Sequence, residues 1–126
     1  MISALVLPGL ALPTASVAQP YPNKVIRIIG TAPPGGSVDI IARLVAPGIQ
    51  ETLKQNVIVE NKGGGGGYLG TEQLSKAPAD GYTIAIGGAF STITSSLQKN
   101  PSYDPRDLVV VGCLPVRRTC WWWDRR

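Results

Sequence analysis

The fold of this chain is decided by residues 32–43, whose sequence is APPGGSVDIIAR. They join a proline-glycine turn to the start of an amphipathic helix, and the apolar run VIRIIG at 25–30 comes directly before them. The run predicts a buried strand, so the turn lies between a strand and a helix, where open α/β folds bind small molecules. Gly35 and Gly36 have no Cβ, so a ligand can approach their backbone closely. We therefore predict a ligand loop here, with a tight turn that binds nothing as the alternative.

The start of this helix favours an anion. The first amides of a helix have no partner within it and carry the positive end of the helix dipole. Ser37 is the predicted N-cap, and Asp39 in the first turn is placed favourably beside that positive end. Together with Pro34 and the two glycines, these residues form the first candidate site.

Two further glycine-bearing loops follow apolar strands. The first is the unbroken glycine run at 63–67, whose helix-side amides could meet a carboxylate; a flexible surface turn is the alternative. The second is GGAFST at 87–92, where the hydroxyls of Ser91 and Thr92 either donate to a bound carboxylate or simply cap a helix. The flanking predicted elements are strands at 56–60 and 82–86 and helices at about 69–76 and 92–97.

Alternation of strands and helices predicts an α/β fold with a parallel sheet of βαβ units. Right-handed crossovers would then bring all three glycine loops to one edge of the sheet. The helix at about 39–53 has an apolar face that includes Ile40 and Leu44. Pro47 lacks the N–H that would bond the Arg43 carbonyl, so we expect a kink or an early stop there.

Composition excludes several classes of function. The 126 residues are 44% apolar and 16% charged, which is typical of one globular domain. The net charge of +4 falls to +1 without the last ten residues, so the body of the protein is near neutral and we expect no nucleic-acid partner. The sequence has no histidine, which removes Ser-His-Asp catalysis and the commonest metal ligand. We predict no enzyme activity, no metal and no cofactor.

Both ends of the chain differ from the middle. Residues 1–18 combine an apolar stretch with small residues at an Ala-x-Ala-like cleavage site and are predicted to be a signal peptide, with an ordinary flexible N-terminus as the alternative. The apolar run is too short to span a bilayer, so no membrane insertion is expected. Residues 113–126 hold both cysteines and all three tryptophans without strand or helix period. We interpret this tail as the product of a frameshift, which re-reading the gene beyond codon 112 would test.

Four motifs in order resemble one family. They are PPGGxxDxxAR from Pro33, Val59-Glu60-Asn61-Lys62 before the glycine run, Gly70-Thr71-Glu72 followed by APADGYT at 77–83, and Tyr103-Asp104-Pro105. The pattern resembles the Bug solute receptors, the periplasmic binding components of tripartite tricarboxylate transporters. It covers about residues 21–112 and departs at Thr31 and Ala32, where relatives often carry an aromatic side chain.

The resemblance implies a periplasmic receptor that captures small carboxylates for the membrane components of such a transporter. Family members have two α/β lobes, and the chain returns from the second lobe to complete the first. Residues 19–112 would therefore form an incomplete first lobe. Such a lobe would supply one wall of the cleft and would keep an open sheet edge and an uncovered face. Two alternatives remain: an inactive, poorly folded fragment, and an enzyme with a phosphate-binding loop, although Gly-Lys-Ser/Thr never follows the glycines. The implied ligand-binding residues are Pro34, Gly35, Gly36, Ser37, Asp39, Gly64, Gly65, Gly66, Gly67, Ser91 and Thr92.

Overall fold

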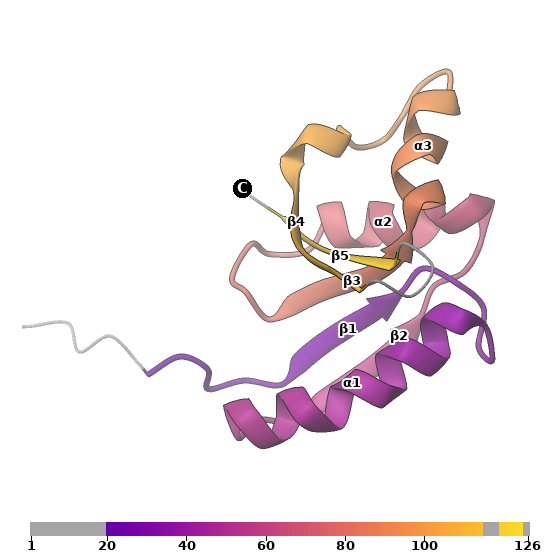
Figure 1. Ribbon diagram of the computed structural model, residues 1–126. Helices are drawn as coiled ribbons and strands as arrows, with labels where there is room; N and C mark the ends of the chain where they lie inside the picture. Colours follow the sequence, from indigo (N-terminus) through magenta and orange to yellow (C-terminus); the bar gives the residue numbers. More distant parts are fainter. Residues whose placement is uncertain (1–19, 115–118, 125–126) are drawn as a thin grey trace, which may run out of the picture.

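The computed structural model describes residues 20–114 and 119–124, so the predicted signal peptide lies outside the described residues. Strands and helices alternate along the first part of the chain, as the sequence predicts (Figure 1). The elements are β1 (Ile26–Gly30), α1 (Ser37–Leu53), β2 (Val57–Asn61), α2 (Tyr68–Ser75), β3 (Thr83–Gly88), α3 (Ala89–Leu97), β4 (Leu108–Leu114) and β5 (Thr119–Asp124), with 3-10 turns at Gly65–Gly67 and Pro105–Asp107.

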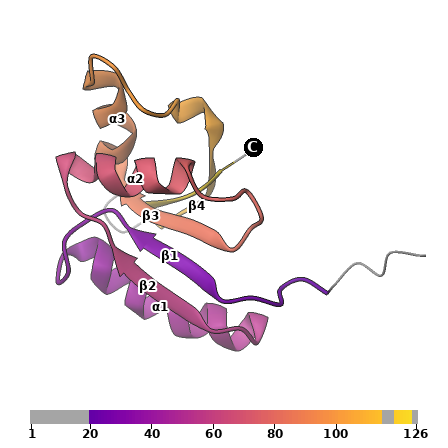
Figure 2. The ribbon, with the colours of Figure 1, turned by 180° about the vertical axis from the view of Figure 1, so that it is seen from behind.

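The strands form a five-stranded sheet in the order β2-β1-β3-β5-β4. The first three strands are parallel, with Ile28 opposite Val59 on one side and Ile84 on the other. This confirms the predicted α/β class and its parallel sheet. Helix α1 covers one face of this part of the sheet, and α2 and α3 lie on the other (Figures 1 and 2).

Period-two alternation in β1 and β3 builds the two halves of the core. Ile28 and Ile86 face α1, where they meet Ala42. Their neighbours Ile29 and Ala85 face the opposite way, where they pack with a group of apolar residues from α2 and the later chain: Leu74, Tyr103 and Leu108. Because both faces of these strands are buried, β1 and β3 are nearly continuous apolar runs, as parallel strands usually are.

The expected early stop of the first helix at Pro47 is wrong. Helix α1 continues through Pro47 to Leu53. Pro47 has no N–H to donate to the Arg43 carbonyl. Because both residues lie on the exposed face of α1, water can bond that carbonyl instead. Packing of the opposite face against the sheet then stabilises the helix on both sides of the proline.

The predicted apolar face of this helix is also partly wrong. Ile40 and Leu44 are exposed, whereas Val38, Ala42, Ala46 and Ile49 pack toward the sheet. The side that faces the core is set by packing against the sheet, and that side carries the smaller residues Ala42 and Ala46 between Val38 and Ile49. The smaller side chains Ala42 and Ala46 let α1 approach the strands closely.

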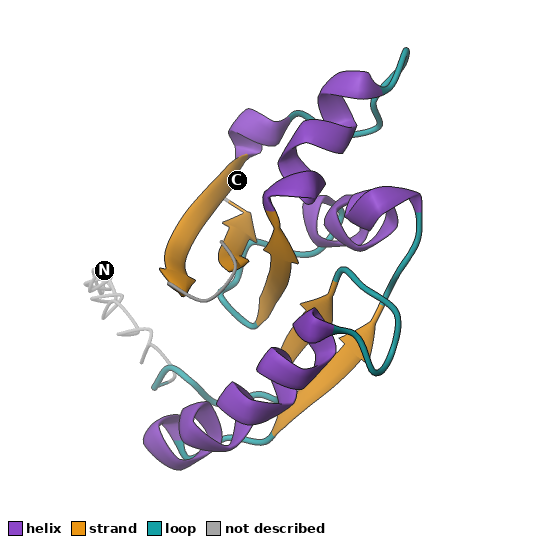
Figure 3. Ribbon diagram, turned by 45° about the vertical axis from the view of Figure 1, so that its right-hand side comes forward, coloured by secondary structure: helices purple, strands orange, loops and turns teal. Residues whose placement is uncertain are grey.

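The tail contains regular structure that its sequence pattern did not indicate. Residues 119–124 form β5, which is antiparallel to both β3 and β4, and β4 itself extends to Leu114. Figure 3 shows this antiparallel pair on one side of β3, with β1 and β2 on the other. The edge of β3 is therefore covered, and the open edges of the described sheet are β2 and β4. How the tail arose stays a prediction.

Candidate ligand-binding site

A cavity of about 680 Å³ opens beyond the carboxyl ends of β1 and β3. The helices that follow these two strands, α1 and α3, lie on opposite faces of the sheet, which makes this a topological switch point of the type that binds ligands in open α/β sheets. The cavity is lined by all three predicted loops, through Thr31, Ala32, Pro33, Ser37, Val38, Gly64, Gly66, Gly67, Gly88, Phe90 and Ser91.

Three helix N-termini meet at this cavity. Helix α1 begins at the lining residue Ser37, α3 begins directly after Gly88, and α2 follows Gly67. The first amides of each helix lack an acceptor within the helix, and each N-terminus carries a partial positive charge of about half a unit. Their convergence makes the cavity favourable for an anion without any cationic side chain.

Asp39 holds the first loop in shape. Its carboxylate accepts bonds from the Gly35 N–H at 2.8 Å and from Nε of Arg43 at 2.8 Å, and the residue is 5% exposed. The Gly35 bond lowers the pKa of Asp39 below its ordinary value, burial opposes this shift, and the Asn61 and Arg43 side chains lower the pKa further. Asp39 does not line the cavity and instead fixes the turn that precedes α1.

The predicted capping roles are wrong. Gly36 is the N-cap of α1, with no side-chain bond to the helix, and Ser37 is the first helical residue. Gly88 is likewise the N-cap of α3, so neither Ser91 nor Thr92 caps that helix. Glycine caps have no side chain that would bond the first amides of these helices.

Close contacts between the loops explain the glycine run. A Cβ on Gly63 would lie 2.7 Å from the backbone nitrogen of Pro33 in the first loop. Gly67 has a φ of 94°, and a Cβ there would lie 2.6 Å from Oγ of Ser91 in the third loop. The glycine run therefore packs tightly between the first and third loops, and side chains at these positions would push the three loops apart.

The hydroxyl groups at the base of the cavity bond one another. Oγ1 of Thr31 and Oγ of Ser91 are 3.3 Å apart, and both residues are buried. Ser91 therefore joins the first and third loops across the end of the sheet. Thr92 lies in α3, but its side chain is outside the described part of the structure.

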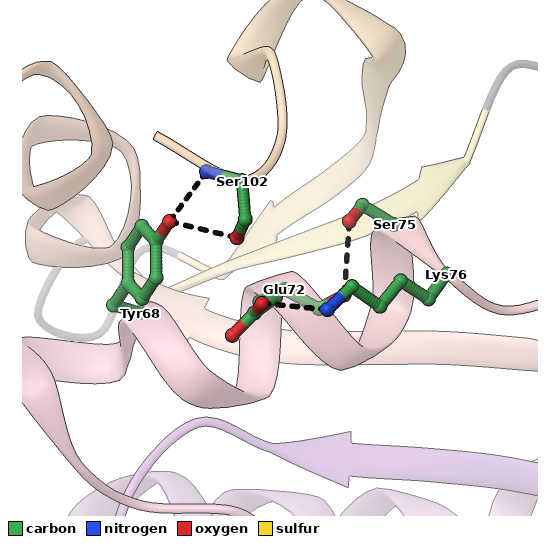
Figure 4. A network of polar contacts seen from close by, with 5 residues as sticks. All are labelled: Tyr68, Glu72, Ser75, Lys76 and Ser102. Carbon is green, nitrogen blue, oxygen red and sulfur yellow. Dashed lines mark hydrogen bonds and ion pairs between the residues drawn. The ribbon is translucent and has the colours of Figure 1, made fainter. Parts of the chain in front are cut away.

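Tyr103, from the Tyr-Asp-Pro motif, fixes the start of α3. Its hydroxyl donates to the Ser91 carbonyl at 3.1 Å, and burial raises its pKa above the ordinary value. The segment that carries Tyr103 is held onto α2 by the Tyr68 hydroxyl, which accepts from the Ser102 N–H at 2.7 Å and lies 2.8 Å from Oγ of Ser102 (Figure 4). The motif thus supports the site from behind without lining it.

The structure brings together part of the predicted set. Ser37, Gly64, Gly66, Gly67 and Ser91 line the cavity, whereas Pro34, Gly35, Gly36, Asp39 and Gly65 do not. Sequence reasoning missed six lining residues: Thr31, Ala32, Pro33, Val38, Gly88 and Phe90. Most of these residues directly follow a predicted strand or directly precede a predicted helix. Their place in the chain could therefore have identified them as lining residues.

The lining residues of this cavity include no charged side chain. Across the described ranges, no cluster of histidine, cysteine, aspartate or glutamate is arranged to hold a metal ion. Within the same ranges, the helices fall short of the length and apolar character that a bilayer crossing requires. The chemistry at the cavity is therefore that of neutral donors and helix dipoles.

Comparisons of the sequence and of the structure with known proteins point to the same family. The model of the tripartite tricarboxylate transporter family receptor matches residues 41–119. BugT of Bordetella pertussis is 37% identical over 127 residues, covering 92% of this chain and 39% of BugT. The structure of the periplasmic binding protein BugD is 41% identical with a TM-score of 0.66, covering 74% of this chain and 31% of BugD. MatC from Rhodopseudomonas palustris, solved with bound malate, is 27% identical with a TM-score of 0.65, covering 75% of this chain and 33% of MatC.

The fold matches that of a solved periplasmic binding protein, and the cavity lies at the switch point where open α/β folds bind small molecules. The chain belongs to the tripartite tricarboxylate transporter receptor family. It spans between three and four tenths of the length of the relatives described above, which is consistent with an incomplete lobe.

Proposed function

We propose that this chain captures a small carboxylate, as one wall of the ligand cleft of a periplasmic receptor that serves a tripartite tricarboxylate transporter. The observation that carries the proposal is the convergence of three helix N-termini on one cavity free of charged lining side chains. A carboxylate fits because it is an anion with two acceptor oxygens that can accept several amide bonds at once.

The relatives support this choice of ligand. MatC was solved with malate, a dicarboxylate, and its fold matches three quarters of this chain. In the proposed complex, the amides at the start of α1 donate to one carboxylate, directly or through water. The amides of Gly67 and Tyr68 already donate to the Gly64 and Gly65 carbonyls, so α2 contributes through the positive end of its dipole.

Three contacts hold the loops in place. Asp39 bonds the Gly35 amide, Ser91 bonds Thr31, and Tyr103 bonds the carbonyl of Ser91 in the first turn of α3.

A serine-to-aspartate change at the cavity tests the proposal. Ser37→Asp in the full chain places a carboxylate among the proposed donors, so we expect carboxylate affinity to fall at least about tenfold. Because an acidic residue suits a helix N-terminus, stability should hold or rise by about 0.3–1 kcal/mol. Binding is measured by titration calorimetry with malate and other small carboxylates, and stability by thermal unfolding.

The matched control is Ser96→Asp, the same chemical change at an exposed position in α3 that does not line this cavity. Unchanged affinity in Ser37→Asp, or an equal loss in both variants, would contradict the proposal. A non-cooperative unfolding trace for the wild-type chain would favour the alternative of an inactive, poorly folded fragment.

We also propose that residues 1–18 direct the chain to the periplasm and are then removed. The family consists of periplasmic receptors, and the sequence before Gln19 has small residues at the cleavage positions. Expression in a Gram-negative host, followed by N-terminal sequencing of the periplasmic fraction, should give a protein that begins at Gln19. An intact Met1 in the cytoplasmic fraction would refute this.

A further inference from the structure

The two cysteines of the chain lie opposite each other in the sheet. Cys113 belongs to β4 and Cys120 to β5, and the backbone register of these antiparallel strands pairs the two residues directly. The pairs on either side, at 112 with 121 and at 114 with 119, continue the same register. Since the sequence holds no other cysteine, the fold brings together both thiols that the chain has.

The backbone spacing at such a pair suits a disulfide bond. Directly opposite residues of antiparallel strands have Cα atoms about 4.5 or 5.5 Å apart, depending on whether the pair is hydrogen-bonded. Disulfides usually join Cα atoms between about 4.4 and 6.8 Å apart, so either kind of pair can be bridged without moving the strands. Cys113 is an exposed free thiol in the structure, so an oxidant can reach it.

From this register we propose that Cys113 and Cys120 are a disulfide site that closes the hairpin of β4 and β5. The proposal goes beyond ligand capture and does not depend on it. The periplasm, proposed above as the location of the chain, is an oxidising compartment in which disulfides form and persist.

The bond lies beside the ligand cavity. Strand β5 covers the edge of β3, with Cys120 opposite Gly87 and Thr119 opposite Gly88. Gly88 itself lines the cavity. A disulfide from β5 to β4 therefore fixes the antiparallel pair next to the third ligand loop.

The oxidant is a small-molecule disulfide such as oxidised glutathione. The Cys113 thiolate attacks one sulfur of that molecule, which forms a mixed disulfide and releases one small thiolate. The Cys120 thiolate then attacks the Cys113 sulfur, which forms the protein disulfide and releases the second small thiolate. In total the protein thiols lose two electrons and two protons, and these reduce the oxidant to two thiols.

An exposed thiol on an edge strand could instead link two copies of the chain. Strand β4 is an open edge of the described sheet, and Val110 and Val111 are exposed on it. Such an edge can pair with a second copy, which could then be joined through the two Cys113 thiols. The bond within one chain is favoured because its two thiols are already held in register, whereas a dimer must first assemble.

The experiment measures disulfide exchange of the full chain in buffers of oxidised and reduced glutathione, with and without urea. Free thiols are alkylated, and the chain is cut with trypsin after Arg117 and Arg118, which lie between the two cysteines. Mass spectrometry then finds peptide 107–117 linked either to peptide 119–125 or to a second copy of itself. Because folding and the disulfide stabilise each other equally, we expect the exchange constant to be at least about tenfold larger in the folded chain.

The matched control moves one thiol by a single position, through Gly112→Cys combined with Cys113→Gly. Successive residues of a strand point to opposite faces of the sheet, so the moved thiol no longer shares a face with Cys120. A Cβ on Gly112 would meet no atom within 4 Å, so the strand has room for the new side chain. In urea the two proteins differ by only one residue of loop length, and we expect the control to gain nothing on folding.

The outcomes decide the proposal. A gain of about tenfold or more on folding, in the natural sequence alone, would support the disulfide site. Equal exchange constants with and without urea, the same gain in the control, or 107–117 linked mainly to itself would each refute it. None of these results bears on carboxylate capture, which the Ser37→Asp titration tests separately.

Discussion

The parallel and antiparallel parts of the sheet differ in how they are built. In the parallel part, β1 and β3 are buried on both faces, and the loops at their carboxyl ends form the cavity. In the antiparallel part, Leu108 is buried, but Val110 and Val111 of β4 are exposed. Among the described strands, β4 pairs with β5 and with no other, so β4 joins the sheet through the tail of the chain.

Core packing and the cavity both belong to the parallel part of the sheet. Both core clusters draw on β1 and β3, whereas the antiparallel pair mainly covers the edge of β3. An uncovered edge presents unpaired backbone groups to other chains. The following substitutions compare the two parts, starting with the largest expected effect.

Breaking β5 should detach the antiparallel part. Trp122 lies opposite Ala85 of β3 and Val110 of β4, so Trp122→Pro places a residue without an N–H inside an interior strand. We expect a loss of about 3 kcal/mol or more in the free energy of unfolding. Hydrogen exchange should also become faster in both 83–88 and 108–114. Trp122→Leu keeps the N–H and is the control; equal protection in both variants would show that β5 is not needed.

Truncating the core should affect the parallel part far more than the antiparallel part. Ile28 is 0% exposed, and Ile28→Ala should cost about 2–5 kcal/mol in the free energy of unfolding. Val110 is 45% exposed, and Val110→Ala should cost less than about 1 kcal/mol. Urea denaturation of both variants measures the difference, and similar costs would contradict the comparison.

A glycine-to-alanine substitution should likewise destabilise the protein more in the parallel part than in the antiparallel part. Gly67→Ala forces a side chain into a positive-φ position against Ser91, so we expect a loss of about 2–4 kcal/mol. A Cβ on Gly112 in β4 would meet no atom within 4 Å, and Gly112→Ala should change stability by no more than about 0.5 kcal/mol. Thermal unfolding compares the two. A tolerated Gly67→Ala would mean that the loops do not pack as described.

The smallest predicted effect is a pH dependence from Asp39. Folding lowers the pKa of Asp39, so its contribution to stability is present above the unfolded pKa of about 4 and is lost as pH falls through the lower folded value. Asp39→Asn should therefore make the fall in stability below about pH 4 shallower. Part of that fall should remain, because Arg27 and Lys76 lower the pKa of Glu60 and Glu72. Urea midpoints between pH 7 and pH 3 measure this, and an unchanged profile would contradict it.

The sequence predicted the parallel part well and the antiparallel part poorly. Glycine turns between apolar runs locate β1, α1, β2, α2 and β3 to within a few residues, because turn chemistry and burial act locally. The pattern at 113–126 gave no such signal, since the pairing of β5 depends on the exposed edge of β3, far away in the chain. The helix caps were misplaced for a similar reason: Gly36 and Gly88, rather than a nearby serine or threonine, begin α1 and α3.

The class of the fold, the three glycine loops and the resemblance to the receptor family can all be read from the sequence alone. These follow from residue type and order along the chain. Tertiary structure decided which loop residues share one cavity, that Asp39 supports the turn from outside it, and that Phe90 lies at its rim. It also decided that the tail joins the sheet. The physical reason is that these features depend on contacts between distant segments, such as Gly67 with Ser91 and Tyr103 with α3, which no local pattern records.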